Sequence, residues 1–241
     1  MKQVLQPVVG IYKSRAYTVI TSKKARRTRL KISPRDGLTI IIPEHAILPD
    51  ISSLLADHSV WIERVFKKLN PIEEPTIPHD IEFKSIDEQW NITYIKTSLR
   101  SVSIDDSCGG TLICSNIPMD PYKGALYLNK WVNQRAKETL TPWIDHVSKL
   151  HNIPYNSVNI RRQKTRWGSC SSSNRINLNQ NLLFLDPDLV TYVILHELVH
   201  TEVPNHSSDF WGNLDSHIPK SKVLQTKLRG LSYKVPQWAW L

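Results

Sequence analysis

The chain has 241 residues, a formal net charge of +9 at pH 7, and 40% hydrophobic residues. This composition is typical of a soluble globular protein, which excludes a disordered or fibrous chain, and the length suits one large or two small domains. Apolar runs stay far below the roughly 18–20 residues that cross a membrane. Three cysteines, Cys108, Cys114 and Cys170, form neither a C-x-x-C pair nor an even disulfide set, so we expect a cytoplasmic protein without a signal peptide.

The first half of the chain is rich in predicted strands. Alternating or continuous apolar runs bounded by turn residues predict strands at 17–20, 26–33, 38–42, 81–84, 90–97, 101–104 and 111–114. Pro34–Gly37 is a predicted turn, residues 49–69 a predicted helix, and residues 70–79 a proline-rich connector. We therefore expect residues 1–118 to form a small sheet-rich lobe.

The N-terminal segment is strongly basic. Its first 35 residues contain ten Lys or Arg and no Asp or Glu. Such a segment could follow a nucleic-acid backbone or bind another anion. We favour the alternative that these basic residues are simply the solvent side of a half-buried strand. Arg27, Arg29 and Lys31 alternate with less polar residues, as the exposed side chains of such a strand do.

The second half, residues 119–241, predicts helices around a small sheet. A long helix from Asp120 to about His151, interrupted or bent near Pro142, precedes strands at 158–167 and 175–183 that residues 168–174 connect. A helix begins at Asp186-Pro187, another follows Ser207, and a helical stretch covers 220–229. The expected fold class is α+β, a catalytic domain with one helix packed on a mixed sheet, preceded by the sheet-rich lobe.

Residues 196–206 read HELVHTEVPNH and carry the clearest chemical signal. His196 and His200 are four residues apart, so on a helix both imidazoles share one face and can reach one Zn²⁺ at about 2.0–2.1 Å. Glu197 lies beside the first ligand, where it can take a proton from water that the metal activates. His206 can return a third nitrogen, and three protein ligands with one open position are typical of catalytic zinc. Asp209 or Asp215 is the rival third ligand.

Polar residues upstream of this motif are candidates for binding substrate. On a strand through 158–167, Arg162, Lys164 and Arg166 would share one face, and we expect Arg166 to stabilise the negative charge that develops during catalysis. Residues 174–180 are expected to form an edge strand above the metal, where Asn177 and Asn179 could contact an extended peptide.

Several motifs together resemble a known family. RWGSC at 166–170, INLN at 176–179, HELVH at 196–200, and NHS at 205–207 with Phe210 and Trp211 are similar to the YgjP-like metallopeptidase domain family, a relative of SprT-like and minimal gluzincin proteins. The resemblance implies a zincin-like fold, with His196, His200 and His206 as metal ligands and Glu197 as the catalytic acid and base. Zinc is the expected metal, with another divalent first-row metal as the alternative.

Three functions are compatible with these residues. The leading hypothesis is a zinc metallopeptidase that acts on a peptide or protein. The second is metal-dependent hydrolysis of a nucleoside triphosphate such as UTP, motivated by links of the resembling family to nucleotide hydrolysis and by the Arg-rich predicted strand. The third is a DNA-associated SprT-like protease, motivated by the basic N-terminal segment and disfavoured because the C-x-x-C pairs of a zinc ribbon are absent.

Overall fold

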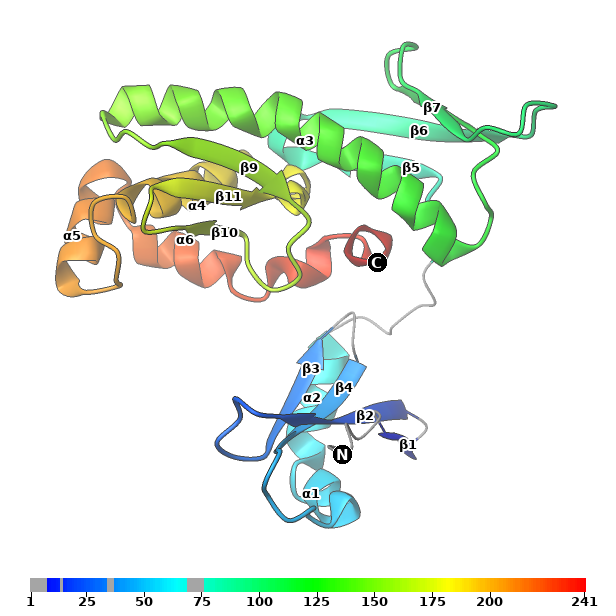
Figure 1. Cartoon of the computed structure of the whole chain (residues 1–241), viewed down its shortest axis with the longest axis vertical. Helices are drawn as coiled ribbons and strands as arrows, with labels where there is room; N and C mark the ends of the chain where they lie inside the picture. The colour runs from blue at the N-terminus through cyan, green and yellow to red at the C-terminus, as the bar shows by residue number, and fades with distance from the viewer. Residues whose placement is uncertain (1–7, 14, 34–36, 69–75) are drawn as a thin grey trace. The chain divides into compact units, whose positions relative to one another are not determined.

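The chain divides into two compact units. The computed structural model describes residues 8–13, 15–33, 37–68 and 76–241 (Figure 1). Its two units are Met1–Glu74 and Pro75–Leu241, called unit 1 and unit 2 below. The predicted turn at 34–37 and the predicted connector at 70–79 lie largely outside the described residues. Each unit is described by itself.

The described residues of unit 1 form a four-stranded sheet with two helices. The sheet has the order β1-β2-β4-β3, with β1 at Val8–Tyr12, β2 at Arg15–Ser22, β3 at Arg29–Ser33 and β4 at Gly37–Pro43. Strand β4 runs parallel to β2 and is an almost continuous apolar run, as expected of a strand at the centre of a sheet. Its buried side chains pack with Leu55 of α1 (Ile51–Asp57) and Ile62 of α2 (Ser59–Lys68). The single helix predicted over 49–69 is therefore two helices, separated at His58, which caps the first.

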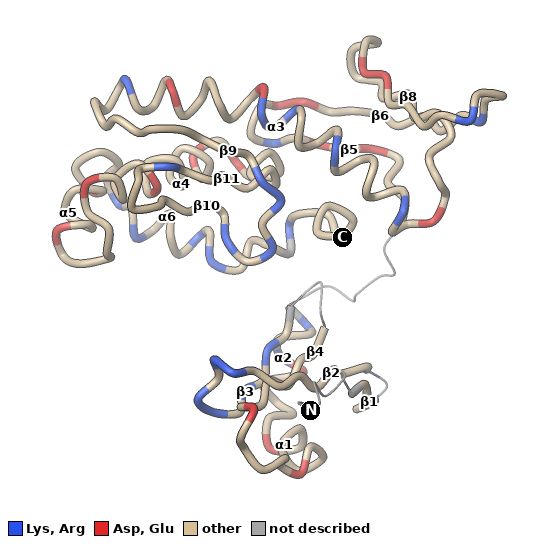
Figure 2. Tube along the Cα trace, viewed as in Figure 1, with Lys and Arg blue, Asp and Glu red and all other residues tan. Residues whose placement is uncertain are grey.

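The basic residues before and within β3 follow the alternation of a half-buried strand. Arg27, Arg29 and Lys31 are exposed, whereas Leu30 and Ile32 pack against the unit 1 core. Figure 2 shows the Lys and Arg positions of the loop that leads into β3. The predicted alternation thus holds from Arg29 to Ile32, whereas Arg27 lies in the loop before β3.

Unit 2 contains two sheets that share one core. The first has the order β5-β6-β8-β7, with β5 at Asp80–Phe83, β6 at Glu88–Ile95, β7 at Ser103–Asp105 and β8 at Thr111–Ser115. The second has the order β10-β11-β9, with β9 at Ser157–Arg161, β10 at Gly168–Cys170 and β11 at Arg175–Asn179. The fold class is α+β, as predicted.

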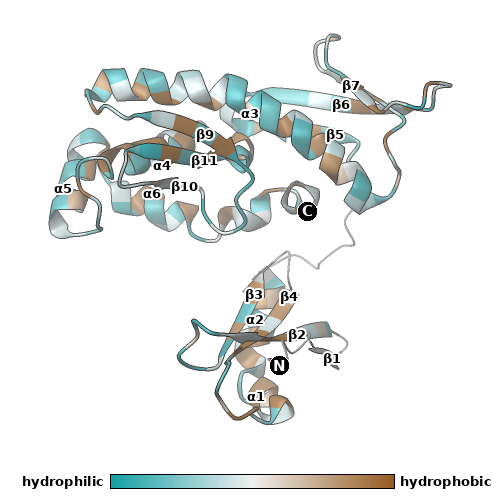
Figure 3. Ribbon diagram, in the orientation of Figure 1, coloured by the Kyte–Doolittle hydropathy of each residue, from teal (hydrophilic) through white to brown (hydrophobic). Residues whose placement is uncertain are grey.

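Two helices of unit 2 pack on the second sheet, and two more pack on one of these helices. They are α3 (Pro121–His151), α4 (Pro187–Val199), α5 (Ser208–His217) and α6 (Ser221–Leu228), and α3 continues through Pro142. Figure 3 shows hydrophobic positions on β9 and β11, which contact α3 and α4 respectively. None of the helices that the structure describes is both long and apolar enough to cross a membrane.

The boundary between the units lies earlier in the chain than the predicted division at 118/119. Phe83 of β5 stacks on Trp131 of α3 with ring centroids 5.6 Å apart, and Trp90 of β6 meets the same indole edge-on at 5.3 Å. These strands therefore bury their apolar face in the core that α3 and α4 also line. The predicted division grouped β5–β8 with the N-terminal strands because both regions are rich in strands. A sheet, however, belongs to the unit whose core it completes.

The second sheet also differs from its predicted form. Strand β9 ends at Arg161 and pairs in parallel with β11, while Gly168–Cys170, predicted as part of a connection, forms the separate antiparallel strand β10. β11 is therefore the central strand and β10 an edge. Asn179 is buried, and its Nδ2 donates to the carbonyl oxygens of Gln163 and Arg166 at 2.8 Å each. The predicted edge at 174–180 was wrong, because the alternation of side chains does not reveal which strands pair.

Candidate metal centre

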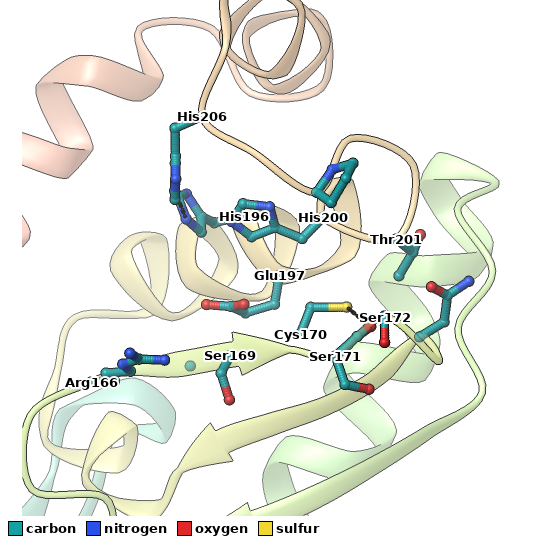
Figure 4. A pocket seen from close by; sticks show the side chains of 13 residues that line it. Arg166, Ser169, Cys170, Ser171, Ser172, His196, Glu197, His200, Thr201 and His206 are labelled. Carbon is teal, nitrogen blue, oxygen red and sulfur yellow. Dashed lines mark hydrogen bonds between the residues drawn. The ribbon is translucent and has the colours of Figure 1, made fainter.

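Helix α4 holds the first two histidines in a fixed relation. Pro187 lies in its first turn, and apolar residues along the helix enter the unit 2 core. One turn of helix separates His196 from His200, and their ring centroids are 4.9 Å apart. The side chain of Glu197 points instead toward β10 (Figure 4). The helix thus presents two imidazoles and one carboxylate on adjoining sides.

His206 reaches the same place from the segment that follows α4. Asn205 accepts a hydrogen bond through its Oδ1 from the backbone N–H of Ser207 at 3.1 Å, which forms a turn before α5. His206 Nε2 then lies 3.0 Å from His196 Nε2, and ligand nitrogens of His196, His200 and His206 all lie within 4.8 Å of one another. We call these three residues the histidine group.

The two rival ligands do not belong to this group. Among the described residues, the clusters able to hold a metal comprise the histidine group alone. Asp215 instead accepts a hydrogen bond from the backbone N–H of Ser221 at 2.9 Å, at the start of α6. Asp209 lies in the first turn of α5, beside Ser208. The structure therefore brings together the three histidines and neither aspartate.

Aromatic side chains of α5 hold the imidazoles in place. Phe210 is fully buried and stacks on His200, with centroids 4.5 Å apart and planes 30° apart. The indole of Trp211 lies 6.0 Å from the His206 ring. His200 Nδ1 faces the carbonyl oxygen of Val203 at 3.1 Å, which leaves Nε2 to face the other histidines. A partner on the far nitrogen commonly fixes the orientation of a metal-binding imidazole.

The histidine group fits a divalent first-row metal. Burial and the neighbouring His200 and His206 lower the pKa of His196 to about 3, so the ring stays neutral, as a ligand must be. Its Nδ1 is buried without a hydrogen-bond partner among the described residues, and its Nε2 meets only another imidazole. Tetrahedral Zn²⁺ with bonds of 2.0–2.1 Å separates its ligand nitrogens by about 3.3 Å, and the nitrogens of His196 and His206 lie 3.0 Å apart.

Glu197 is a buried carboxylate beside this group. It is 5% exposed, and no hydrogen-bond donor among the described residues reaches it. Burial raises its pKa to about 8, and the positive charge of Arg166 opposes that rise. A proton-transferring group works best when its pKa lies near the working pH. The environment of Glu197 is thus suited to accepting and returning a proton.

These groups line one cavity of about 650 Å³. One wall consists of β10 and the turn that follows it, and the other is formed by α4 and the segment up to His206 (Figure 4). Sequence reasoning placed no part of 168–173 in this wall, although the RWGSC motif contains the strand. Cys170 also lines the cavity, and burial together with the charge of Glu197 raises the pKa of its thiol. Because the thiolate is the nucleophile and the metal ligand, a thiol with a raised pKa is poorly suited to either role.

The predicted basic face is divided in the structure. Arg166 lines the cavity, whereas Arg162 lines a second hollow of about 540 Å³ beside α3, and exposed Lys164 lines neither. The three residues do not share a strand, because β9 ends at Arg161. Asn177 donates through Nδ2 to Ser169 Oγ at 3.2 Å, a contact within the sheet. Of the residues expected to bind substrate, the structure thus places Arg166 in the cavity and assigns Asn179 a role within the fold.

The family of the chain follows from its similarity to known proteins. The sequence model of the YgjP-like metallopeptidase domain matches residues 26–230. The chain belongs to the YgjP-like metallopeptidase domain family. The match includes all three histidines, Glu197 and the whole of β10.

Two solved structures are also similar to parts of this YgjP-like chain. One is the metallopeptidase zymogen abylysin of Pyrococcus abyssi, 25% identical, with 38% of this chain and 96% of that chain covered at a TM-score of 0.34. The other is the metallopeptidase zymogen jannalysin of Methanocaldococcus jannaschii, 23% identical, with 39% and 94% covered at a TM-score of 0.34. No curated protein matches the chain.

Proposed function

We propose that this chain is a zinc-dependent metallopeptidase. Its three imidazoles, from His196, His200 and His206, hold the metal, and Glu197 is the general base. The observation that carries the proposal is that the histidine group and a buried carboxylate line the same cavity in a metallopeptidase-family domain. Three protein ligands leave one position open for reaction.

Each residue has a defined part in the reaction. Zn²⁺ bound by the histidine group supplies a Lewis acid that acidifies water and polarises a carbonyl oxygen. Glu197 takes the proton of the water that attacks the peptide carbonyl and passes it to the departing amine. Arg166, which lines the cavity, favours the ionised form of Glu197 and offers positive charge where the carbonyl oxygen becomes negative.

The wall formed by β10 favours an extended peptide as the substrate. Trp167 accepts a backbone hydrogen bond from Asn179 at 2.8 Å, and Ser171 donates one to Arg175 at 3.0 Å. In an antiparallel pair, hydrogen-bonded residues alternate with residues that direct their backbone N–H and C=O away from the partner strand. Gly168 and Cys170 therefore offer polar backbone groups at the free edge, where a peptide can add as a strand.

The charges around the cavity support a peptide over a nucleotide. Among the described residues, Arg166 is the one lysine or arginine that lines it. A triphosphate is usually bound by several cations or a bound metal with backbone N–H groups, whereas a peptide bond is neutral. Arg162 lines a different hollow, so of the basic residues that motivated nucleotide hydrolysis Arg166 alone lines the cavity of the histidine group.

Metal analysis and a substrate panel test the proposal. Protein purified without chelator is expected to contain about one zinc per chain, and to cleave unfolded casein while leaving nucleoside triphosphates intact. His196→Ala is expected to lose both metal and activity, while Glu197→Ala keeps the metal and loses the activity. A preparation without any first-row metal, or one that hydrolyses nucleotides and spares casein, would overturn the proposal.

A further inference from the structure

Gly168 occupies a position where a side chain has no room. It is the first residue of β10, and its φ is not among the positive values that favour glycine, so its backbone conformation is open to other residues. Glycine weakens a strand and often marks the close approach of another group. A Cβ built on Gly168 would lie 2.6 Å from both Cγ and Oε1 of Glu197, and 2.8 Å from its Cδ. The space of the missing methyl group is therefore filled by the Glu197 side chain.

Packing against this strand is what restrains the carboxylate. No hydrogen-bond donor among the described residues reaches Glu197, although the residue is 5% exposed. Arg166 interacts with it through charge and is itself exposed, so it offers a weak positional constraint. The close contact at Gly168 involves Cγ, one bond beyond Cβ. An added methyl group could therefore be accommodated only by turning the whole carboxylate away or by shifting α4 from β10.

We propose that Gly168 is a positioning residue for Glu197. The absence of a Cβ at this position lets the Glu197 side chain lie against β10 with its carboxylate in the cavity. Any larger residue displaces the carboxylate from the side of the histidine group. The contact itself is independent of the reaction, whereas its consequence for catalysis rests on the proposed peptidase function.

The effect on catalysis is tested with Gly168→Ala. Displacing a catalytic group by about 1 Å can cost about 100-fold in rate, so kcat for casein-derived peptides is expected to fall by about that factor. Affinity for Zn²⁺ is expected to remain within about threefold, because the atoms nearest to the added methyl group belong to Glu197 and not to the histidine group. The matched control is Gly212→Ala in α5, where an added Cβ meets nothing within 4 Å. That variant is expected to keep wild-type kcat.

A double-mutant cycle on stability tests the contact without any activity measurement. The metal-free full-length protein is unfolded by heat and followed by tryptophan fluorescence, because Trp61 alone of the eight tryptophans lies in unit 1. Gly168→Ala is expected to lower Tm by about 5 °C when Glu197 is present. In the Glu197→Ala background, which lacks the atoms in contact, the same change is expected to lower Tm by less than about 1 °C.

The outcomes separate the alternatives. Equal losses of Tm in both backgrounds would show that β10 itself requires glycine, and unchanged Tm with unchanged kcat would show that the methyl group is accommodated; either result overturns the proposal. If Gly168→Ala fails to fold, recovery of a cooperative transition in Gly168→Ala with Glu197→Ala supports it, and failure of both overturns it. A wild-type protein without peptidase activity would refute the proposed function and leave the result of the stability cycle valid.

Discussion

The two units of this chain use polar residues in different ways. In unit 2, the carboxylate of Glu197 is buried and the imidazoles of His196 and His200 are partly buried around a cavity, next to a core that includes two sheets and several helices. In unit 1, the core is smaller, and the basic residues of the segment around β3 lie on the solvent side of a sheet. Burying ionisable groups costs free energy unless a metal or hydrogen bonds compensate for it. The unit that contains the candidate metal centre is therefore recognised by the burial of its polar groups rather than by their number. The match to the family model nevertheless begins within unit 1.

The largest effect is expected for a variant that tests whether the histidine group forms a single metal site. His206→Ala is expected to weaken Zn²⁺ affinity by more than about 100-fold, since even residues behind the ligands contribute 10–100-fold. The fold should persist because His206 is exposed. Zn²⁺ titration into metal-free protein measures the change, with Asp215→Ala as the matched control. Wild-type affinity for Zn²⁺ in His206→Ala, with a loss of affinity in Asp215→Ala, would show that Asp215 and not His206 is the third ligand.

Matched core truncations would test whether the two cores are energetically separate. Leu198→Ala in α4 and Ile62→Ala in α2 remove side chains that are at most 1% exposed, and each is expected to cost about 2–5 kcal/mol in the unit that contains it. Hydrogen exchange resolved along the sequence would measure each unit in each variant. Added Zn²⁺ is expected to slow exchange in unit 2 only, because a ligand stabilises the structure that binds it. Equal protection of unit 1 by Zn²⁺ would contradict the separation.

Substitutions of two arginines would compare the two hollows of unit 2. Arg166→Ala is expected to lower kcat/KM by about tenfold, because it removes the positive charge beside Glu197 and the reacting carbonyl. Arg162→Ala is expected to change kcat/KM by less than about twofold, because Arg162 lines the other hollow. Peptide hydrolysis at fixed ionic strength measures both. Similar losses in the two variants would mean that both cations act on the substrate.

The smallest effect is expected on the basic face of unit 1. Replacing Arg27 and Arg29 by Gln should change the free energy of unfolding by less than about 0.5 kcal/mol, as is usual for exposed residues. Duplex DNA binding should weaken no more than when exposed Lys149 and Lys227 are replaced by Gln. Salt-dependent binding curves test this point. A much larger loss for the Arg27 and Arg29 variant would reveal a nucleic-acid site in unit 1.

Much of the candidate site could be predicted because its geometry is local. The four-residue spacing of His196 and His200 sets their relation once a helix forms, and the apolar residues of 189–199 predicted that helix. The turn at Asn205 and the aromatic residues of α5 also lie within a few residues of His206. Both ends of α3 and the start of α4 were predicted to within one or two residues for the same reason. Interactions between near neighbours leave a pattern in the sequence.

Only the tertiary structure decided which distant segments meet. Residues 168–170 have no apolar alternation that marks a strand, yet they form the edge strand and the cavity wall, and their contact with Glu197 spans 29 residues of chain. The sequence also did not reveal that Arg162 and Arg166 line two different hollows, or that β5–β8 belong to unit 2. Strands of similar composition can pair in several orders, and the choice depends on the core that each order buries. The sequence by itself thus determined the chemical groups and their helix, while packing between distant elements decided how the base is positioned.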